Sequence, residues 1–168
     1  MEFIGRINRR KIYYVQRRNN PNWKYSLPKK DWIAFTISNK EDEELIPPVV
    51  NVCLDKKVLF ATNAGEFGSQ AEDYFLEEIG WRNVQFEEKN GRKFDHEESP
   101  MSSAHKNFGE GFWFATVVAS DREKVMDKVV CIDFTKRKVK KNLVELIDKI
   151  NKGWLPSDQE IEMAQYDN

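Results

Sequence analysis

Two residues whose side chains take part in catalysis in many enzymes, a serine and a histidine, lie close together at positions 103 and 105. A histidine can act as a general base, and a serine beside such a base can become a nucleophile. On a strand, Ser103 and His105 would point to the same face, because alternate side chains do so. Asp133 is our candidate for the carboxylate that orients the histidine. No Gly-x-Ser-x-Gly turn surrounds Ser103, so the spacing alone does not enforce a catalytic pair.

A second group of polar residues lies in segment 63–69, where Asn63 and Glu66 are candidate binding residues. A glycine-containing loop before a helix is a suitable context for an anion site. This loop lacks the lysine of a phosphate-binding loop, and Glu66 would repel a phosphate, so a tight turn is the simpler interpretation. His96 has acidic neighbours, but with two histidines and no metal-type cysteine spacing we expect neither a metal site nor a cofactor.

Several apolar runs of strand length would position these residues. Residues 32–37, 58–62 and 129–134 are continuously apolar or nearly so, which is typical of strands covered on both faces, and 101–105 is a further candidate strand. Residues 3–7 and 11–16 are rich in β-formers and predict a hairpin. A short strand at 84–86 and a polar loop at 87–99 complete this part of the prediction.

Helix signals alternate with these strands. Pro47 and Pro48 are suited to the first turn of a helix, and Ser69 with Glu72 forms a capping-box pattern for a helix that Gly80 would end. A stripe of Leu and Ile predicts a helix over 140–152, and Ser157 with Glu160 predicts a short final one.

The aromatic block at residues 112–118 is ambiguous, because it is apolar on every side and rich in β-formers. Either a buried helix or a strand fits this pattern. We favour a helix, because parallel strands at 101–105 and 129–134 need a crossover between them.

Together these elements predict an α/β fold with a mostly parallel sheet and helices on both faces, Rossmann-like or flavodoxin-like, plus the N-terminal β-hairpin. We expect a single domain over residues 1–168, with the hairpin at 1–20, the α/β core at 22–153 and a short helix or tail at 154–168. Ligands of such folds bind outside the carboxyl ends of the strands. Those ends present Ser38, Asn63, Glu66, Ser102, Ser103, His105 and Asp133.

The charge of the chain is divided unevenly. Residues 1–30 contain nine Lys or Arg and a single Glu, whereas 27 of the 28 acidic residues follow. This asymmetry indicates either an intramolecular fit or a surface for an anionic partner, and Arg9 and Arg10 are the candidate binding residues; the simplest alternative is a solvated hairpin face. The basic run 136–141 also fits a solvated turn, and the overall acidity argues against general nucleic-acid binding.

The two cysteines, Cys53 and Cys131, lie inside apolar runs, so we expect buried free thiols. No run approaches the roughly 20 apolar residues of a membrane span, and residues 1–6 do not resemble a signal peptide. We therefore expect a soluble cytoplasmic protein without a membrane partner.

Three features together resemble an uncharacterised family of small bacterial α/β proteins. They are a Trp-x-x-x-Leu-Pro motif at residues 23–28, a strand and acidic helix over 61–78, and His105 followed by Phe112-Trp113-Phe114-Ala115. The resemblance covers residues 22–150 and leaves the hairpin outside. It implies the order of strands and helices given above and no particular activity. Segment 63–68 differs from the Trp- and Asp-rich segment of those relatives, so no shared ligand is implied.

These observations lead to three functional hypotheses. The first is a non-catalytic protein-binding module, such as an immunity protein that neutralises a toxin; the acidic body would suit a basic partner such as a nuclease. The second is a small enzyme or ligand-binding protein with a site at the strand ends around His105 and Asp133. The third is an RNA-binding accessory protein that uses the basic hairpin, where aromatic residues are interleaved with basic ones.

Overall fold

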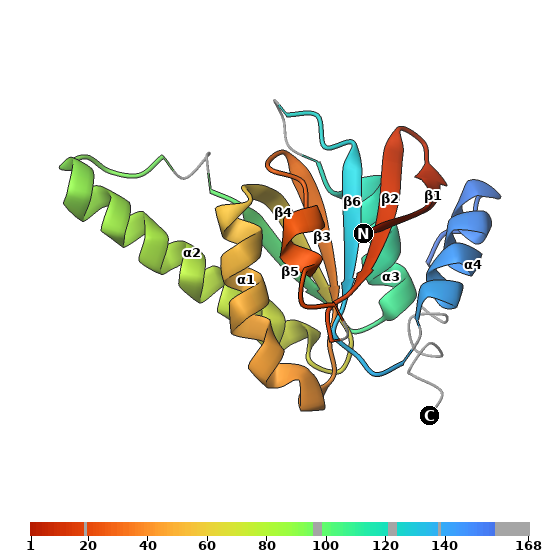
Figure 1. The fold of residues 1–168 in the computed structure, drawn as a ribbon. Helices are drawn as coiled ribbons and strands as arrows, with labels where there is room; N and C mark the ends of the chain where they lie inside the picture. Colours follow the sequence, from red (N-terminus) through yellow and green to blue (C-terminus); the bar gives the residue numbers. More distant parts are fainter. Residues whose placement is uncertain (19, 96–98, 121–123, 138, 157–168) are drawn as a thin grey trace.

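A computed structural model describes residues 1–18, 20–95, 99–120, 124–137 and 139–156. These residues form one six-stranded mixed sheet with helices packed on it (Figure 1). The strands are β1 (Glu2–Ile7), β2 (Arg10–Gln16), β3 (Trp32–Ile37), β4 (Val58–Ala64), β5 (Met101–His105) and β6 (Lys128–Asp133), in the spatial order β1-β2-β6-β3-β4-β5. Only β1 and β2 pair antiparallel; every other neighbouring pair is parallel. The predicted α/β class and mostly parallel sheet are confirmed.

The N-terminal hairpin is part of the main sheet. Strand β2 pairs with β6, and Tyr14 lies opposite Cys131 in that parallel register. Asn8 adopts a left-handed conformation (φ 51°) in the tight turn between β1 and β2. The chain therefore begins at one edge of the sheet, and its last strand inserts between β2 and β3.

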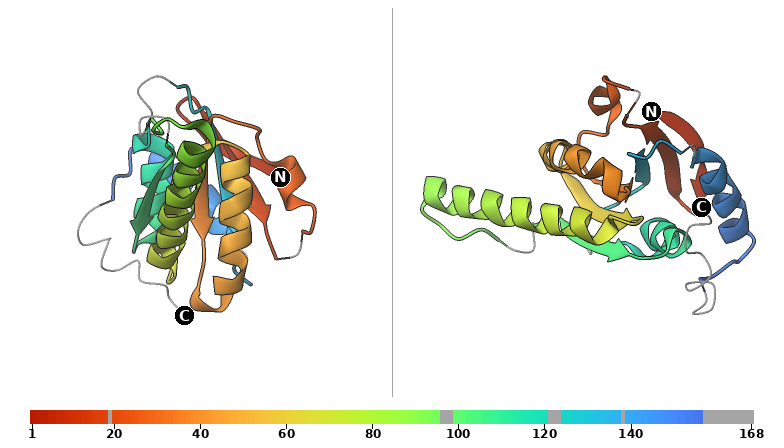
Figure 2. Two further views of the ribbon diagram at one scale, coloured as in Figure 1. Left: turned by 90° about the vertical axis from the view of Figure 1, so that its left-hand side faces the viewer. Right: turned by 90° about the horizontal axis from the view of Figure 1, so that it is seen from below.

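The helices form two layers around the sheet (Figure 2). Helix α1 (Ile46–Asp55), helix α2 (Gly68–Asn90) and the 3₁₀ helix η1 (Trp23–Ser26) pack on one face. Helix α3 (Phe108–Trp113), the π-helix η4 (Phe114–Val118) and helix α4 (Lys140–Asn151) pack on the other. The 3₁₀ helix η2 (Lys40–Leu45) leads into α1, whose first turn contains the two prolines, as the sequence predicted. Both cysteines are buried and free, as expected.

Helix α2 differs most from the prediction. Its N-cap is Phe67, without a side-chain cap, so the capping box at Ser69 is wrong. Gly80 does not end the helix, which runs on to Asn90. Gly80 lies on an exposed face of α2, and apart from its chain neighbours and the helix's own backbone no atom lies within 4 Å of where its Cβ would be. The predicted strand at 84–86 is helical, and the end of α2 is set by Gly91 (φ 63°). The distal half of α2 projects well beyond the sheet (Figures 1 and 2).

The aromatic block at 112–118 is helical, as we favoured. Its α-helical part ends at Trp113 and continues as the π-helix, whose Thr116 hydroxyl donates to the Phe112 carbonyl (2.7 Å). Gly111 allows this helix to lie close to the sheet, because a Cβ there would come within 3.1 Å of His105 Cβ and 3.3 Å of Ala64 Cβ. The final helix predicted from Ser157 and Glu160 lies outside the described residues, as does His96.

Candidate functional site

The carboxyl edge of the sheet between β3 and β6 is the first candidate for a functional site. The chain runs from β3 to β4 and β5 on one side of β3, then crosses back to β6 on the other side. Such a switch in strand order creates a crevice in many α/β proteins. The register brings Ile37 and Gln16 to either side of Asp133 at this edge.

Asp133 is held by hydrogen bonds within the protein. The Tyr14 hydroxyl donates to Oδ2 (2.7 Å), and the Thr135 backbone N–H (2.9 Å) and hydroxyl (2.8 Å) donate to Oδ1. Asp133 is fully buried, and this burial raises its pKa above the ordinary value, although the donated hydrogen bonds oppose the shift. Both carboxylate oxygens are therefore engaged: Oδ2 joins β6 to β2, and Oδ1 holds the turn that follows β6.

Asn63 has a similar structural role on the opposite face. Its Oδ1 accepts from the Thr36 hydroxyl (2.6 Å), and its Nδ2 donates to Ser102 Oγ (3.0 Å) and the Ser103 carbonyl (3.1 Å). The side chain thus links β3, β4 and β5 and is fully buried. Glu66 follows in the loop and is exposed, whereas Ser38 is buried and its hydroxyl has no hydrogen-bond partner among the described residues.

Ser103 and His105 do lie together, and Glu110 joins them. His105 Nε2 lies 3.3 Å from Ser103 Oγ, and His105 Nδ1 lies 3.4 Å from Glu110 Oε1. The histidine side chain is 11% exposed, and the Phe114 ring lies against it, with 4.8 Å between the ring centroids. Asn107 caps α3 through its side chain and so places Glu110 in the first helical turn, beside the end of β5.

His105 and Asp133 are not brought together. Strands β4 and β3 separate β5 from β6, so three strand spacings, about 14 Å, lie between them. Sequence reasoning missed Glu110 as the neighbouring carboxylate. The signal that could have found it is Asn107, a good N-cap residue three positions before Glu110.

The two candidate arginines have different environments. Arg10 donates to the carbonyl of Ala115 (2.9 Å) and to that of Ala119, so its guanidinium caps the carboxyl end of η4. A cation at a helix C-terminus is favourable, because the last carbonyls have no helical partner. Arg9 is exposed in the hairpin turn.

Part of the basic N-terminal segment fits the acidic body. Arg18 donates to Asp42 Oδ1 (2.6 Å), to the Phe134 carbonyl (3.2 Å) and to the Glu41 carbonyl (3.2 Å). The Asp42 side chain is fully buried and the Arg18 side chain is 24% exposed, so this ion pair is partly shielded from solvent. The hydrogen bond to Asp42 raises the pKa of Arg18. One of the two interpretations of the charge asymmetry, an intramolecular fit, thus applies to Arg18.

A different kind of surface lies between α1 and α2. A groove of about 250 Å³ is lined by Pro47, Val50, Asn51, Tyr74, Glu77, Glu78 and Trp81. Trp81, at the edge of this groove, is 59% exposed. Arg82 fixes the two walls relative to each other, because it donates to Glu78 (2.8 Å) on its own helix and to Asp55 (2.9 Å) and Asn51 (3.0 Å) on α1. Sequence reasoning did not single out this groove.

Within the part of the chain that the structure describes, no cluster of three or more His, Cys, Asp or Glu side chains could hold a metal ion. No described helix is long and apolar enough to cross a membrane.

The fold and the sites define a mixed α/β domain whose strand-end polar residues are largely engaged internally. The chain belongs to a family described as a domain of unknown function (DUF7684), whose model matches residues 10–150. The resemblance to an uncharacterised family is thereby confirmed, and the match begins at β2, so it includes half of the hairpin that we had left outside. No curated protein and no solved structure matches the chain.

Proposed function

We propose that this chain is a non-catalytic protein-binding module that docks a basic partner in the groove between α1 and α2. The exposed Trp81 is the observation that carries the proposal. Tryptophan is among the residues that contribute most at protein interfaces, because it buries a large apolar area on binding. Leaving it beside an open groove exposes that area to water in the free protein.

The charge around the groove favours a basic partner. Asp73 and Glu77 are exposed on α2, and Glu43 and Glu44 precede α1 on η2. Arg82, beside the groove, already pairs with Glu78 and Asp55. The lining residues of the groove include two glutamates and no lysine or arginine, and this favours a cationic partner.

The engagement of the strand-end residues supports a binding role without catalysis. Asp133 and Asn63 are fully buried, and each is hydrogen-bonded to a neighbouring strand, so neither is presented to a substrate. A small protein that binds and covers a basic partner would fit the role of an immunity protein, which would neutralise a toxin such as a nuclease in the cytoplasm.

We also regard the sheet as Rossmann-like, a view supported by the switch in strand order at β3.

The groove can be tested by affinity capture from the native cell with matched variants. The wild-type chain should retain one basic protein in stoichiometric amount, and Trp81→Ala should weaken that binding at least about 30-fold, the usual loss at an interface hot spot. Val144→Ala changes an exposed apolar residue on α4 and serves as the control. Recovery of the free chain alone, or equal retention by Trp81→Ala, would contradict the proposal.

A second candidate function is the hydrolysis of an ester. It is favoured by the contacts that His105 makes with Ser103 on one side of its ring and with Glu110 on the other. Ser103 Oγ would attack the ester carbonyl carbon while its proton passes to His105 Nε2, and Glu110 would orient the Nδ1–H. The protonated histidine would then give that proton to the departing alcohol, and water would hydrolyse the acyl-serine. The Ser103, His105 and Glu110 side chains of this candidate site are not part of the groove between α1 and α2.

Release of p-nitrophenol from p-nitrophenyl acetate tests this second candidate. Ser103→Ala and His105→Ala should each abolish turnover, and Glu110→Gln should reduce it. Ser102→Ala is the matched control, because Ser102 lies on the same strand but bonds to Asn63 on the other face. Turnover by wild type no faster than in buffer, or turnover that Ser103→Ala retains, would rule the candidate out.

A further inference from the structure

We propose that a lysine-lined pocket beside β2 binds the phosphates of single-stranded nucleic acid. The pocket has a volume of about 290 Å³, and Lys29, Lys30, Lys128, Tyr13 and Ser26 contribute to its lining. These residues come from β2, η1, the start of β6 and the segment before β3. The site lies apart from both the α1–α2 groove and the Ser103 cluster, so it goes beyond the functions proposed above.

The ammonium groups of this pocket are poorly neutralised by the protein. Among the described residues, the ion-pair partners of Lys30 and Lys128 are their chain neighbours, Asp31 at 3.5 Å and Asp127 at 3.8 Å. Lys29 is exposed and makes no ion pair among the described residues. Ion pairs this long and exposed contribute little, so the pocket keeps an excess of positive charge.

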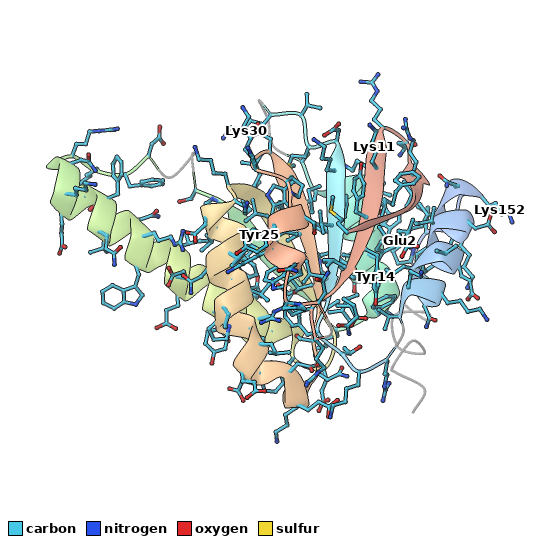
Figure 3. The ribbon with its side chains drawn as sticks, viewed as in Figure 1. Glu2, Lys11, Tyr14, Tyr25, Lys30 and Lys152 are labelled. Atoms are coloured by element: carbon cyan, nitrogen blue, oxygen red, sulfur yellow. The ribbon has the colours of Figure 1, made fainter. Side chains whose placement is uncertain are left out.

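The strand register adds a further cation. Lys11 on β2 lies directly opposite Lys128 on β6, and like charges opposite each other across a sheet are unfavourable. A phosphate between them would convert this repulsion into attraction. Figure 3 shows Lys11 and Lys30 toward the end of the sheet where β2 and β6 begin, with Tyr25 on η1 in front of the sheet.

Two exposed aromatic residues lie next to lining residues of the pocket, Tyr25 before Ser26 in the chain and Phe3 against Tyr13, and they indicate which phosphate-bearing ligand it fits. Tyr25 follows Lys24 and precedes Ser26 of the lining; its side chain is 73% exposed, and Lys24 Nζ lies 5.3 Å from the ring centroid. Phe3 is 54% exposed and packs edge-to-face on Tyr13, with 5.7 Å between the ring centroids. Exposed rings beside cations suit unpaired bases, which stack on them while the phosphates meet the lysines. A duplex keeps its bases stacked inside and would leave these rings unused.

Fluorescence anisotropy with fluorescein-labelled twelve-nucleotide oligouridine tests the inference. Binding to the full chain should weaken linearly in a plot of log affinity against log salt, with a slope of about −2 to −3 for three or four lysine–phosphate contacts. Lys29→Ala should reduce the magnitude of the slope by about 0.7. Tyr25→Ala should weaken binding at least about fivefold and leave the slope unchanged, because base stacking releases no counterions.

Lys152→Ala is the control, since Lys152 is an exposed lysine on the far side of the molecule, after α4, where it pairs with Asp148 (Figure 3). It should bind as the wild type does. No binding at 20 mM salt, or binding that neither Lys29→Ala nor Tyr25→Ala changes, would overturn the proposal. Equal affinity for a duplex of the same length would overturn the assignment to single strands. Folding of each variant is checked by circular dichroism, and Lys29→Gln provides a second substitution at the same exposed position.

Discussion

Tyr14 and Asp133 join the N-terminal hairpin to the core through a buried 2.7 Å hydrogen bond from the tyrosine hydroxyl to Asp133 Oδ2. Burial raises the pKa of both groups, because each would carry its negative charge away from water. The carboxylate and the phenol are separated by 119 positions in the sequence. Their contact makes the attachment of β2 to β6 sensitive to protonation.

The pH dependence of stability should change in Asp133→Asn. The folded pKa of Asp133 is raised, so the folded state binds the proton more tightly than the unfolded state does. This group's stabilising contribution is therefore complete below its unfolded pKa and declines as the pH rises through the folded pKa, at up to about 1.4 kcal/mol per unit of pKa shift. The free energy of unfolding in urea, measured from pH 4 to 8, should show a decline in wild type that is missing in the variant. A difference between the two proteins that stays constant with pH would contradict the expectation.

The two neighbouring arginines of the hairpin should differ in their effect on stability. Arg10→Ala removes the donors to the carbonyls of Ala115 and Ala119, two buried residues, and should lower the free energy of unfolding by about 1–3 kcal/mol. Arg9→Ala changes an exposed side chain and should alter it by less than about 0.5 kcal/mol. Guanidinium chloride titrations of both variants provide the measurement. Equal losses would show that Arg10 does not cap η4.

Substitution by alanine at two helical glycines, Gly111 and Gly80, should change the stability of the protein in opposite directions. At Gly111 a Cβ would crowd His105 and Ala64 at 3.1 and 3.3 Å, so Gly111→Ala should destabilise the protein by about 1–3 kcal/mol, the usual cost of overpacking. At Gly80 nothing lies within 4 Å, and Gly80→Ala should stabilise α2 by about 0.5–1 kcal/mol. Thermal unfolding followed by circular dichroism would distinguish the two. A destabilised Gly80→Ala would imply that α2 is interrupted at Gly80.

Local sequence patterns were a poor guide where distant contacts outweigh them. The glycine at position 80 suggested the end of a helix, but α2 continues because Arg82 anchors it to α1 and Phe86 packs edge-to-face on Phe94 of the returning segment, with 5.3 Å between the ring centroids. The candidate site was predictable in part. Ser103 and His105 meet because alternation along a strand is a local rule, whereas Glu110 comes near only through the packing of α3 against β5.

The sequence by itself determined the buried parallel strands, the helix that begins with two prolines and the burial of both cysteines. Continuous apolar runs and the geometry of proline act over a few residues, so they can be recognised without the fold. Only the tertiary structure decided that β2 pairs with β6, that the Tyr14 hydroxyl donates to Asp133, and that Trp81 lies beside a groove between α1 and α2. Each of these depends on which elements become neighbours, and that choice depends on the packing of the whole sheet and its helices.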